Sequence, residues 1–483
     1  MNKILLLLPI LIPLAGGAFL WFVRMNRILR NIFVEAVTVA TAAAAWLLAI
    51  NRPNGALDLF AFGESLPIRL SLDGLGSLFL CMASTLWIFV AVYAFSYMKD
   101  EEHTHMFFTF FILSLAAADG IALASNLITM YFFYEMLTLF TIPLVMHGCK
   151  KTDVHAGYVY AAYQLGGAAF AFVGIVYLVT VTGIGDFTLG GFGPDAPAHT
   201  LMLESIYFAM LLGFGVKACL FPLHRWLPTA SVAPTPVTAL LHAAAVVKAG
   251  IFAIVRLSYF TFGTEFLKGS NVGTLALWLA CFTAVFAAVR AVREHHFKRR
   301  LAYSTVSNLS YILIGVFTFT EAGLAAGLCH MIFHAVIKCN AFLACGAVMK
   351  KGRTQLDELD GVGYKMPVTF VCYTISATAL AGIPPLSGFI SKWMLLSASA
   401  TGGAVIGTAA LVISSLLAAV YMLTPSVRAF FPAQDEGREL SDISEAPLGM
   451  TAAMVVFAAA VILFGLFAGP VVSFCESVAL GAI

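Results

Sequence analysis

Apolar segments recur along the chain from one end to the other, separated by short polar stretches. A helix needs roughly 20 apolar residues to cross a bilayer, and the segments reach that length. No stretch between them is long enough to form a soluble domain, so the pattern predicts an all-α polytopic membrane protein. About fourteen transmembrane helices are expected, over approximately residues 4–22, 29–50, 74–97, 106–124, 127–147, 157–181, 201–221, 236–260, 272–290, 301–319, 323–349, 367–397, 403–427 and 448–473.

Two of these helices contain residues that interrupt helical hydrogen bonding. Pro222 and Pro228 break the seventh helix. Gly382, Pro384 and Pro385 break the twelfth, in the segment "ALAGIPPLSGFISKW". Broken helices at matching places in two halves of a chain leave backbone groups free to bind ions or water near the bilayer midplane. The interruptions therefore indicate an ion pathway.

The same spacing predicts internal repeats within one membrane domain. Helices 4–8 and helices 9–13 are two sets of five, so the second set enters the membrane with opposite topology. We expect a single domain over residues 1–483, with helices 1–3 in residues 1–105, the inverted repeats in 106–260 and 272–430, and helix 14 in 445–483.

Composition and charge agree with a membrane protein and predict its orientation. Hydrophobic residues make up 61% of the chain and charged residues 11%, whereas soluble domains carry about a quarter charged residues. The loops after odd-numbered helices hold eighteen Lys and Arg residues, with Lys298, Arg300 and Arg438 among them. The loops after even-numbered helices hold three, namely Arg52, Arg69 and Lys268. Since cytoplasmic loops are enriched in Lys and Arg, we expect both termini on the outer face.

The nine cysteines lie almost all inside apolar segments, with no CxxC pair and no histidine at metal-ligand spacing. Such cysteines usually pack as small hydrophobic side chains. No glycine-rich motif of the phosphate-binding type occurs either. We therefore expect neither a metal nor another cofactor in this chain.

When loop residues, Lys3 and Arg256 at a helix end are set aside, four of the 27 basic residues remain inside the predicted spans, and Glu135 is interpreted as the one carboxylate at mid-span. The four are Lys217, Lys248, Lys338 and Lys392. A charge at the bilayer centre costs at least about 2.5 to 3.5 kcal/mol. A long side chain near a helix end avoids this cost by reaching toward water, which can serve Lys392 and Lys217. Lys248 and Glu135 lie too deep for that explanation, so we interpret them as functional.

Helix 11 adds a second signal in "GLCHMIFHAVIKCNAF". His330, His334 and Lys338 are four residues apart and so lie on one face of the helix. Proton transfer needs groups that bind and release protons near neutral pH, whereas a free lysine has a pKa of about 10.4. Burial lowers the pKa of a lysine, and a nearby carboxylate raises it again. A glutamate that approaches or leaves Lys217 can therefore switch the lysine between holding and releasing a proton. His242 is a possible auxiliary site.

Several of these segments resemble a known family. The segment "FPLHRWLPTASVAPTPVTALLHAAAVVKAGIF" is similar to the helix 7–8 signature of the antiporter-like subunits of respiratory complex I, which multi-subunit sodium/proton antiporters and membrane-bound hydrogenases share. The segments "FKRRLAYSTVSNLSYILIG", "HAVIKCNAFLACGAV" and "AGIPPLSGFISKW" resemble the helix 9–10 junction, helix 11 and broken helix 12 of that family. The match runs in order over roughly residues 70–430.

The resemblance implies a proton-pumping module with fourteen core helices and two inverted repeats. It implies that the family's ion-path positions are occupied here by Glu135, Lys217, Lys248, His330, His334, Lys338 and Lys392. Protons would pass from Lys217 and Lys248 along helix 11 to Lys392, a terminal site that is lysine in some members and glutamate in others. The chain ends soon after helix 14, so we expect a short, medial-type or hydrogenase-type member.

Three functions stay open from the sequence. The first is an ion-translocating, non-catalytic subunit of a redox-driven complex. That complex would resemble complex I, an energy-converting hydrogenase or a formate-linked complex, and its iron–sulfur or other redox centres would lie in partner subunits. The second is a subunit of a non-redox sodium/proton antiporter, and the third is a structural or quinone-site subunit without an ion path. Expected partners are the bilayer, protons or sodium and other membrane subunits, including further antiporter-like ones, but no nucleic acid. The expected location is a prokaryotic cytoplasmic (inner) membrane.

Overall fold

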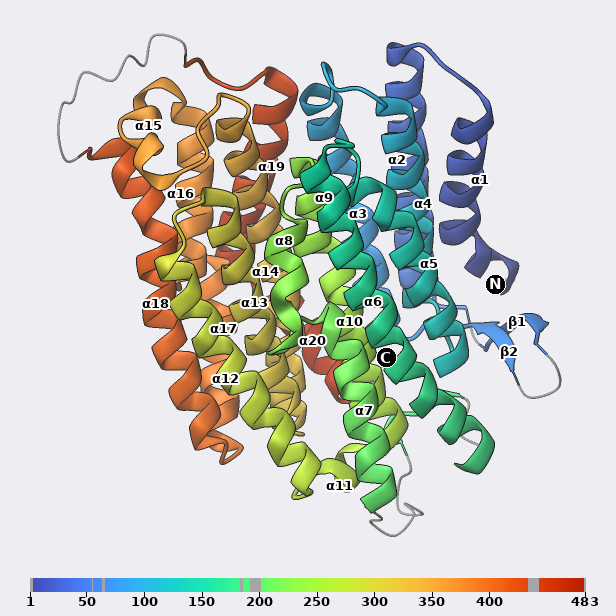
Figure 1. The fold of residues 1–483 in the computed structure, drawn as a ribbon. Helices are drawn as coiled ribbons and strands as arrows, with labels where there is room; N and C mark the ends of the chain where they lie inside the picture. Colours follow the sequence, from blue (N-terminus) through green and yellow to red (C-terminus); the bar gives the residue numbers. More distant parts are fainter. Residues whose placement is uncertain are drawn as a thin grey trace.

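Helices make up almost all of the fold, as the apolar pattern predicts (Figure 1). The computed structural model describes residues 3–53, 55–62, 66–182, 186–191, 201–432 and 443–481. The first half holds η1 (Lys3–Leu7), α1 (Leu8–Phe22), α2 (Arg27–Asn51), β1 (Leu57–Ala61), β2 (Pro67–Leu70), α3 (Gly74–Tyr97), α4 (Thr104–Ala122), α5 (Leu127–Val145), α6 (Lys151–Tyr177), η2 (Leu178–Thr182), α7 (Leu201–Lys217), η4 (Leu223–Arg225), α8 (Trp226–Ala230), α9 (Thr235–Ala239), η5 (Leu240–Ala244), α10 (Val246–Val255), η6 (Arg256–Phe262) and α11 (Thr264–Leu267). The second half holds α12 (Asn271–Arg293), α13 (Phe297–Val316), α14 (Glu321–Met349), η7 (Leu356–Leu359), α15 (Val362–Lys365), α16 (Pro367–Ala381), α17 (Ser387–Thr401), α18 (Val405–Phe430), α19 (Leu448–Leu466) and α20 (Gly469–Ala479).

The number of membrane spans agrees with the prediction. Within the described residues, eleven helices are long and apolar enough to cross a membrane, and the segment from Thr235 to Phe262 counts as one of them. The helix α7, the helix α13 and the broken pair α16–α17 occupy the positions of the other three predicted helices.

Capping side chains explain where several helices begin. Each of these residues accepts a hydrogen bond from the backbone N–H three positions ahead, which satisfies a donor that has no partner within the helix. The capping residues are Asn26 for α2, Asp73 for α3, Asn126 for α5, Ser270 for α12 and Thr320 for α14.

Three details of the prediction are wrong. The span predicted as helix 14, residues 448–473, is two helices, because α19 ends at Leu466 and Pro470 starts a new one. The seventh helix ends at Lys217, five residues before Pro222, since Cys219 takes a left-handed conformation with φ 61°. The hairpin of β1 and β2 was not predicted. Its Arg69 forms ion pairs with Asp58 on β1 at 2.5 Å and with Asp186, which lies outside the hairpin, at 2.6 Å.

The centre of the fold is formed by α14 and the segment from Thr235 to Phe262. Every residue of that segment is buried, and so is nearly every residue of α14. A helix that is apolar on all sides packs inside a bundle and not at its edge, so both helices occur where the sequence pattern places them. Peripheral helices differ, since α1 and α2 expose large apolar side chains such as Phe22 and Ile28.

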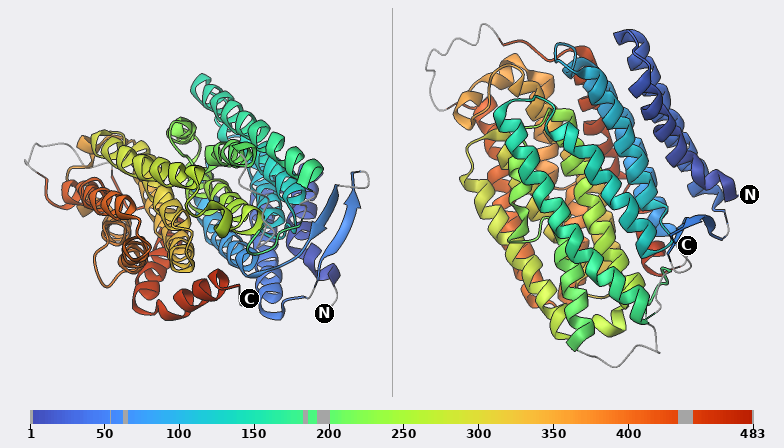
Figure 2. Two further views of the ribbon diagram at one scale, coloured as in Figure 1. Left: turned by 90° about the horizontal axis from the view of Figure 1, so that it is seen from below. Right: turned by 45° about the vertical axis from the view of Figure 1, so that its right-hand side comes forward.

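The molecule has two ends that differ in charge. The hairpin, the N-terminus and the C-terminus lie together at one end, which we call the terminal face (Figures 1 and 2). The loops with Lys99 and Lys350 and the helix α15 lie at the opposite end, which we call the basic face (Figure 1). Two of these loops are tied together by an ion pair of 3.3 Å between Lys350 and Glu101. Arg438, counted with the basic loops, lies outside the described residues.

Candidate functional site

The first buried lysine, Lys217, is the last residue of α7. Its side chain is 0% exposed, and its Nζ donates hydrogen bonds to the carbonyl of Tyr134 at 3.1 Å and the hydroxyl of Thr138 at 2.7 Å. The same Nζ lies 3.4 Å from the centroid of the Tyr134 ring, a cation–π contact. All of these partners belong to α5, so α5 determines the surroundings of Lys217.

Glu135 lies on α5 next to Tyr134 but does not bind Lys217 directly. It is half-buried, and its Oε1 has no hydrogen-bond partner in the described part of the chain. The two charges attract each other electrostatically, yet no ion pair within 4 Å joins them among the described residues. The arrangement therefore holds the carboxylate near the ammonium without closing the pair.

Lys248 lies at the centre of the fold, directly after an irregular helical turn. The segment η5 is a π-helix, in which the N–H of Ala245 bonds to the carbonyl of Leu240 at 2.9 Å, five residues back. The carbonyl of His242 accepts a hydrogen bond from Lys248 Nζ at 3.4 Å. Lys248 Nζ also lies 2.7 Å from Nδ1 of His334 on α14. Single π turns inside α-helices occur often at functional sites.

The two histidines of α14, His334 and His330, extend the series of polar side chains that begins at Lys248. The rings of His334 and His330 lie 5.8 Å apart, one turn from each other on the helix. Nδ1 of His330 lies 2.9 Å from the hydroxyl of Ser391 on α17. In each of these two rings Nε2 is buried and has no partner among the described residues. Each ring therefore has one engaged nitrogen and one free to take or give a proton.

Lys392 follows Ser391 and caps the break in the twelfth predicted helix. Its Nζ donates hydrogen bonds to the carbonyl of Leu380 at 2.6 Å and of Ala381 at 3.4 Å, the last two residues of α16. The ring centroid of Tyr311 is 5.6 Å away. The α16 helix ends at Ala381 and is capped by Gly382, which has φ 91°, and the carbonyl end of a helix attracts a cation. The interruption thus supplies the binding groups for this lysine.

The structure brings most of the predicted residues together and orders them. Lys248, His334, His330 and Lys392, the last through the adjacent Ser391, form one continuous series, which we call the polar file. Lys338 lies to the side, where its Nζ bonds to Leu301 at 3.1 Å and to Ser304, both on α13.

The remaining predicted residues lie around this file. His242 contacts it through its backbone carbonyl, while its Nε2 lies 3.4 Å from the hydroxyl of Ser231. Lys217 and Glu135 form a separate group on α7 and α5. Pro222 precedes η4, and Pro384 and Pro385 lie between α16 and α17.

Three buried ionisable residues, Lys298, Arg300 and Asp119, were not predicted as buried from the sequence. Lys298 and Arg300 were assigned to a loop, but α13 begins at Phe297 and buries both; Lys298 is 2% exposed. Asp119 on α4 is a further buried carboxyl group; it is 0% exposed, and neither of its carboxylate oxygens has a partner within the described chain. Extending the helical period of α13 by one turn would have placed Lys298 above the buried Leu301.

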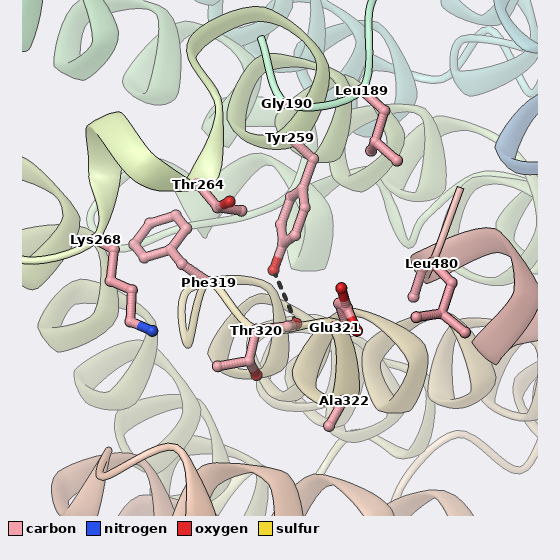
Figure 3. Close-up of a pocket in the computed structure, with 11 residues that line it drawn as sticks. Leu189, Gly190, Tyr259, Thr264, Lys268, Phe319, Thr320, Glu321, Ala322 and Leu480 are labelled. Atoms are coloured by element: carbon pink, nitrogen blue, oxygen red, sulfur yellow. Dashed lines mark hydrogen bonds between the residues drawn. The ribbon is translucent and has the colours of Figure 1, made fainter. Parts of the chain in front are cut away.

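Two adjoining cavities open at the terminal face. The first, of about 580 Å³, lies between η6, α11 and the start of α14; Tyr259 donates a hydrogen bond to the carbonyl of Thr320 across it at 3.4 Å (Figure 3). The second, of about 470 Å³, shares Glu321 and Leu480 with the first and extends to Trp393, the residue after Lys392.

Comparison with known proteins identifies the family. Residues 124–418 match the model described as "NADH:quinone oxidoreductase/Mrp antiporter, TM", and residues 60–108 match "NADH-Ubiquinone oxidoreductase (complex I), chain 5 N-terminus". The chain is 27% identical over 479 residues to an Na(+)/H(+) antiporter subunit of Alkalihalophilus pseudofirmus, covering 98% of this chain and 96% of that protein. It is 30% identical over 425 residues to the NADH-quinone oxidoreductase subunit N of Desulforudis audaxviator, covering 84% of this chain and 83% of that protein.

The fold has a close counterpart among solved structures. A chain of the Mrp complex from Dietzia sp. DQ12-45-1b superposes with a TM-score of 0.87, at 23% identity, over 99% of this chain and 96% of that chain. At that identity the likeness establishes the fold, and the family model establishes kinship. The chain therefore belongs to the family of antiporter-like membrane subunits shared by NADH:quinone oxidoreductases and Mrp antiporters.

Proposed function

We propose that this chain moves protons across the membrane as one subunit of a larger membrane complex. The polar file carries the proposal: four titratable side chains follow one another through the buried centre, with Lys248 Nζ 2.7 Å from His334 and His330 2.9 Å from Ser391. Ionisable groups inside a membrane domain are costly and mark ion pathways. Imidazole and amine groups bind protons, which makes protons a better fit than sodium, a cation that needs oxygen ligands.

The path has a direction in this proposal. The basic face is the cytoplasmic one, by the positive-inside rule, and both termini lie on the outer side. A proton enters near Lys217 and Lys248, passes His334 and His330, and reaches Lys392. From there it leaves to the terminal face, where the exposed carboxylates of Glu321 and Glu476, which line the cavity beside Trp393, attract cations.

Glu135 acts as the switch of the entry half. Its carboxylate lies close enough to attract Lys217 but does not pair with it, so a small movement of α5 changes how firmly the ammonium is held. The hydrogen bonds and the cation–π contact of Lys217 Nζ are all with α5, and any such movement also displaces Tyr134 and Thr138. Binding of a proton at Lys217 and the position of α5 are thereby coupled.

Two kinds of assembly suit this subunit. In a redox-driven complex the chain is a non-catalytic pump, and iron–sulfur or other redox centres belong to partner subunits. In a sodium/proton antiporter of the Mrp kind no redox partner is needed, and the nearly end-to-end match with the antiporter subunit of Alkalihalophilus pseudofirmus supports that candidate. A purified intact complex distinguishes the two, because mass spectrometry of its subunits finds dehydrogenase or hydrogenase subunits in the first case alone.

The proton path itself is tested in the intact complex reconstituted into vesicles. Lys248→Ala is expected to abolish proton translocation, measured with a pH-sensitive dye, because it removes the central member of the file. His334→Ala is expected to slow it strongly, because it removes the file member that bonds to Lys248. Lys338→Ala is expected to slow it more mildly, because Lys338 lies to the side of the file. Lys365→Ala is the matched control, since that lysine is exposed on α15. Normal translocation by an assembled Lys248→Ala complex contradicts the proposal and favours a structural or quinone-site subunit.

A further inference from the structure

The start of α13 contains a buried lysine that the polar file does not include. Lys298 is 2% exposed, although it lies in a run of three basic residues at the basic face. Its Nζ donates a hydrogen bond of 2.6 Å to the carbonyl of Ala233. No carboxylate pairs with it among the described residues. A buried ammonium without a counter-ion is costly, so its presence calls for a function.

The two arginines that follow have different surroundings. Arg299 is exposed. Arg300 is buried, and its guanidinium bonds to the carbonyls of Tyr421, Val292 and Glu294, an arrangement that fastens α18 and the end of α12 to α13. Lys298 makes one such contact. The segments that Arg300 joins explain why its charge is buried. The single contact of Lys298 does not explain the burial of its charge in the same way.

The neighbours of Lys298 connect it to the proposed path. Ala233 belongs to the link between α8 and α9, where the hydroxyl of Ser231 lies 3.4 Å from Nε2 of His242. The ammonium groups of Lys298, Lys338 and Lys248 all act electrostatically on His242. The thiol of Cys345 lies in the field of both Lys298 and Lys338.

The position along α13 supports the same connection. Leu301, whose carbonyl binds Lys338, lies three residues after Lys298 and thus on the same side of the helix. Lys298 therefore lies about one turn nearer to the basic face than the group around Lys338.

We infer that Lys298 is the entry residue of the path, a buried proton carrier between the basic face and the group formed by His242, Lys338 and Lys248. This inference rests on the proposed function. In the step, an N–H bond of the Lys298 ammonium breaks and the proton goes to the ring of His242, whose Nδ1 is buried without a partner among the described residues. The neutral amine then takes a new proton from water at the basic face.

The alternative is that Lys298 only anchors Ala233, and three substitutions separate the two roles. Lys298→Arg keeps the charge and a donor but cannot release a proton in a protein. Lys298→Gln keeps a donor without a charge. Lys298→His is shorter, yet it exchanges protons near neutral pH.

The experiment measures proton uptake from the basic side in vesicles that hold the intact complex, at equal assembly by native gel. Lys298→Arg and Lys298→Gln are expected to lower uptake about a hundredfold or more, the loss typical of a removed proton-transfer group. Lys298→His is expected to exceed both, and Arg299→Ala to equal the unchanged protein. Uptake in Lys298→Arg equal to or above that in Lys298→His overturns the inference.

The result separates the inference from the function on which it rests. If Lys248→Ala abolishes uptake while Lys298→Arg transports normally, the proton path stands and the entry role of Lys298 is refuted. If Lys248→Ala also transports normally, both are refuted. If Lys298→Arg fails to assemble, the comparison of Lys298→His with Lys298→Gln decides alone, and equal uptake by these two overturns the inference.

Discussion

Lys217 and Lys392 each lie beside an interrupted helix, but they are held in different ways. Lys217 ends the segment before its break and bonds to a neighbouring helix, α5, through the carbonyl of Tyr134 and the hydroxyl of Thr138. Lys392 follows its break and bonds to Leu380 and Ala381, two carbonyls that the break itself leaves free. The first lysine therefore responds to movement between helices, whereas the second responds to the shape of its own helix.

The burial of the two lysines follows the same division. Lys217 is 0% exposed, and Lys392 is 5% exposed with cavities of the terminal face reaching its neighbour. A switch must be shielded from water to hold its state, while an exit site must exchange with water. The difference in surroundings thus matches the difference in role that we propose.

The largest effect is expected from Lys217→Ala. It removes the ammonium at the proposed switch, so proton translocation should fall by about a hundredfold or more, within the range for lost proton-transfer groups. Vesicle-based proton flux measures it, and Glu135→Ala should match it. Assembly should remain largely intact, because the two residues do not form a closed ion pair. Substantial translocation by an assembled Glu135→Ala complex would remove the switch from this mechanism.

Lys392→Arg tests the other half and is expected to have the next largest effect. Arginine keeps the charge and can reach the carbonyls of the break, but its pKa stays above about 12 in a protein, so it cannot release a proton to the terminal face. The complex should assemble and lose most of its translocation. An assembled Lys392→Arg complex that pumps normally would refute the exit role and leave Lys392 as a binding group for the break.

A smaller effect is expected from Thr138→Val, which removes one acceptor of Lys217 at nearly constant volume. A hydrogen bond to a charged group contributes about 1.5 to 3 kcal/mol, so the rate should change by roughly tenfold. Ser391→Ala tests the polar file and not the binding of a lysine, because Ser391 links His330 to the residue next to Lys392, so it should also slow translocation. Unchanged translocation in Thr138→Val would show that Lys217 does not depend on this acceptor.

The smallest effects are expected at the aromatic rings. Tyr134→Leu removes a ring centroid 3.4 Å from Lys217 Nζ, whereas Tyr311→Leu removes one 5.6 Å from Lys392 Nζ. Cation–π contacts contribute about 0.5 to 2 kcal/mol and weaken with distance. Translocation should therefore fall several-fold in Tyr134→Leu and less in Tyr311→Leu. Tyr134→Phe, which keeps the ring, is the control and should resemble the unchanged protein.

The sequence predicts much of the fold because apolar length and buried charge leave few alternatives. Helices occur near the predicted place of each span, although the predicted helix 14 is divided into α19 and α20. The break at Gly382 is where the glycine and the two following prolines indicate. Titratable residues four apart, such as His330 and His334, also predict a common face correctly. These features depend on local chemistry, which a single sequence contains.

The rest depends on contacts between distant segments. Nothing in the sequence shows that Lys248 meets His334 while Lys338 turns toward α13. In the sequence, Lys298 stands among other charged residues, as an exposed loop residue would. Its burial follows from the packing of α13 against the α8–α9 link. The conformation of Cys219, which ends α7 before Pro222, likewise has no local signal, because cysteine rarely takes a positive φ.

The π-helical turn before Lys248 makes the number of residues in this segment important for the site. Such a turn accommodates one more residue than a regular α-helix of the same course. Deleting one residue within Leu240–Ala244 would close the turn, and the flanking segments would keep their faces. The carbonyl of His242 would then return to regular helical bonding and be lost to Lys248. At this point of the protein, the number of residues matters as much as their identity.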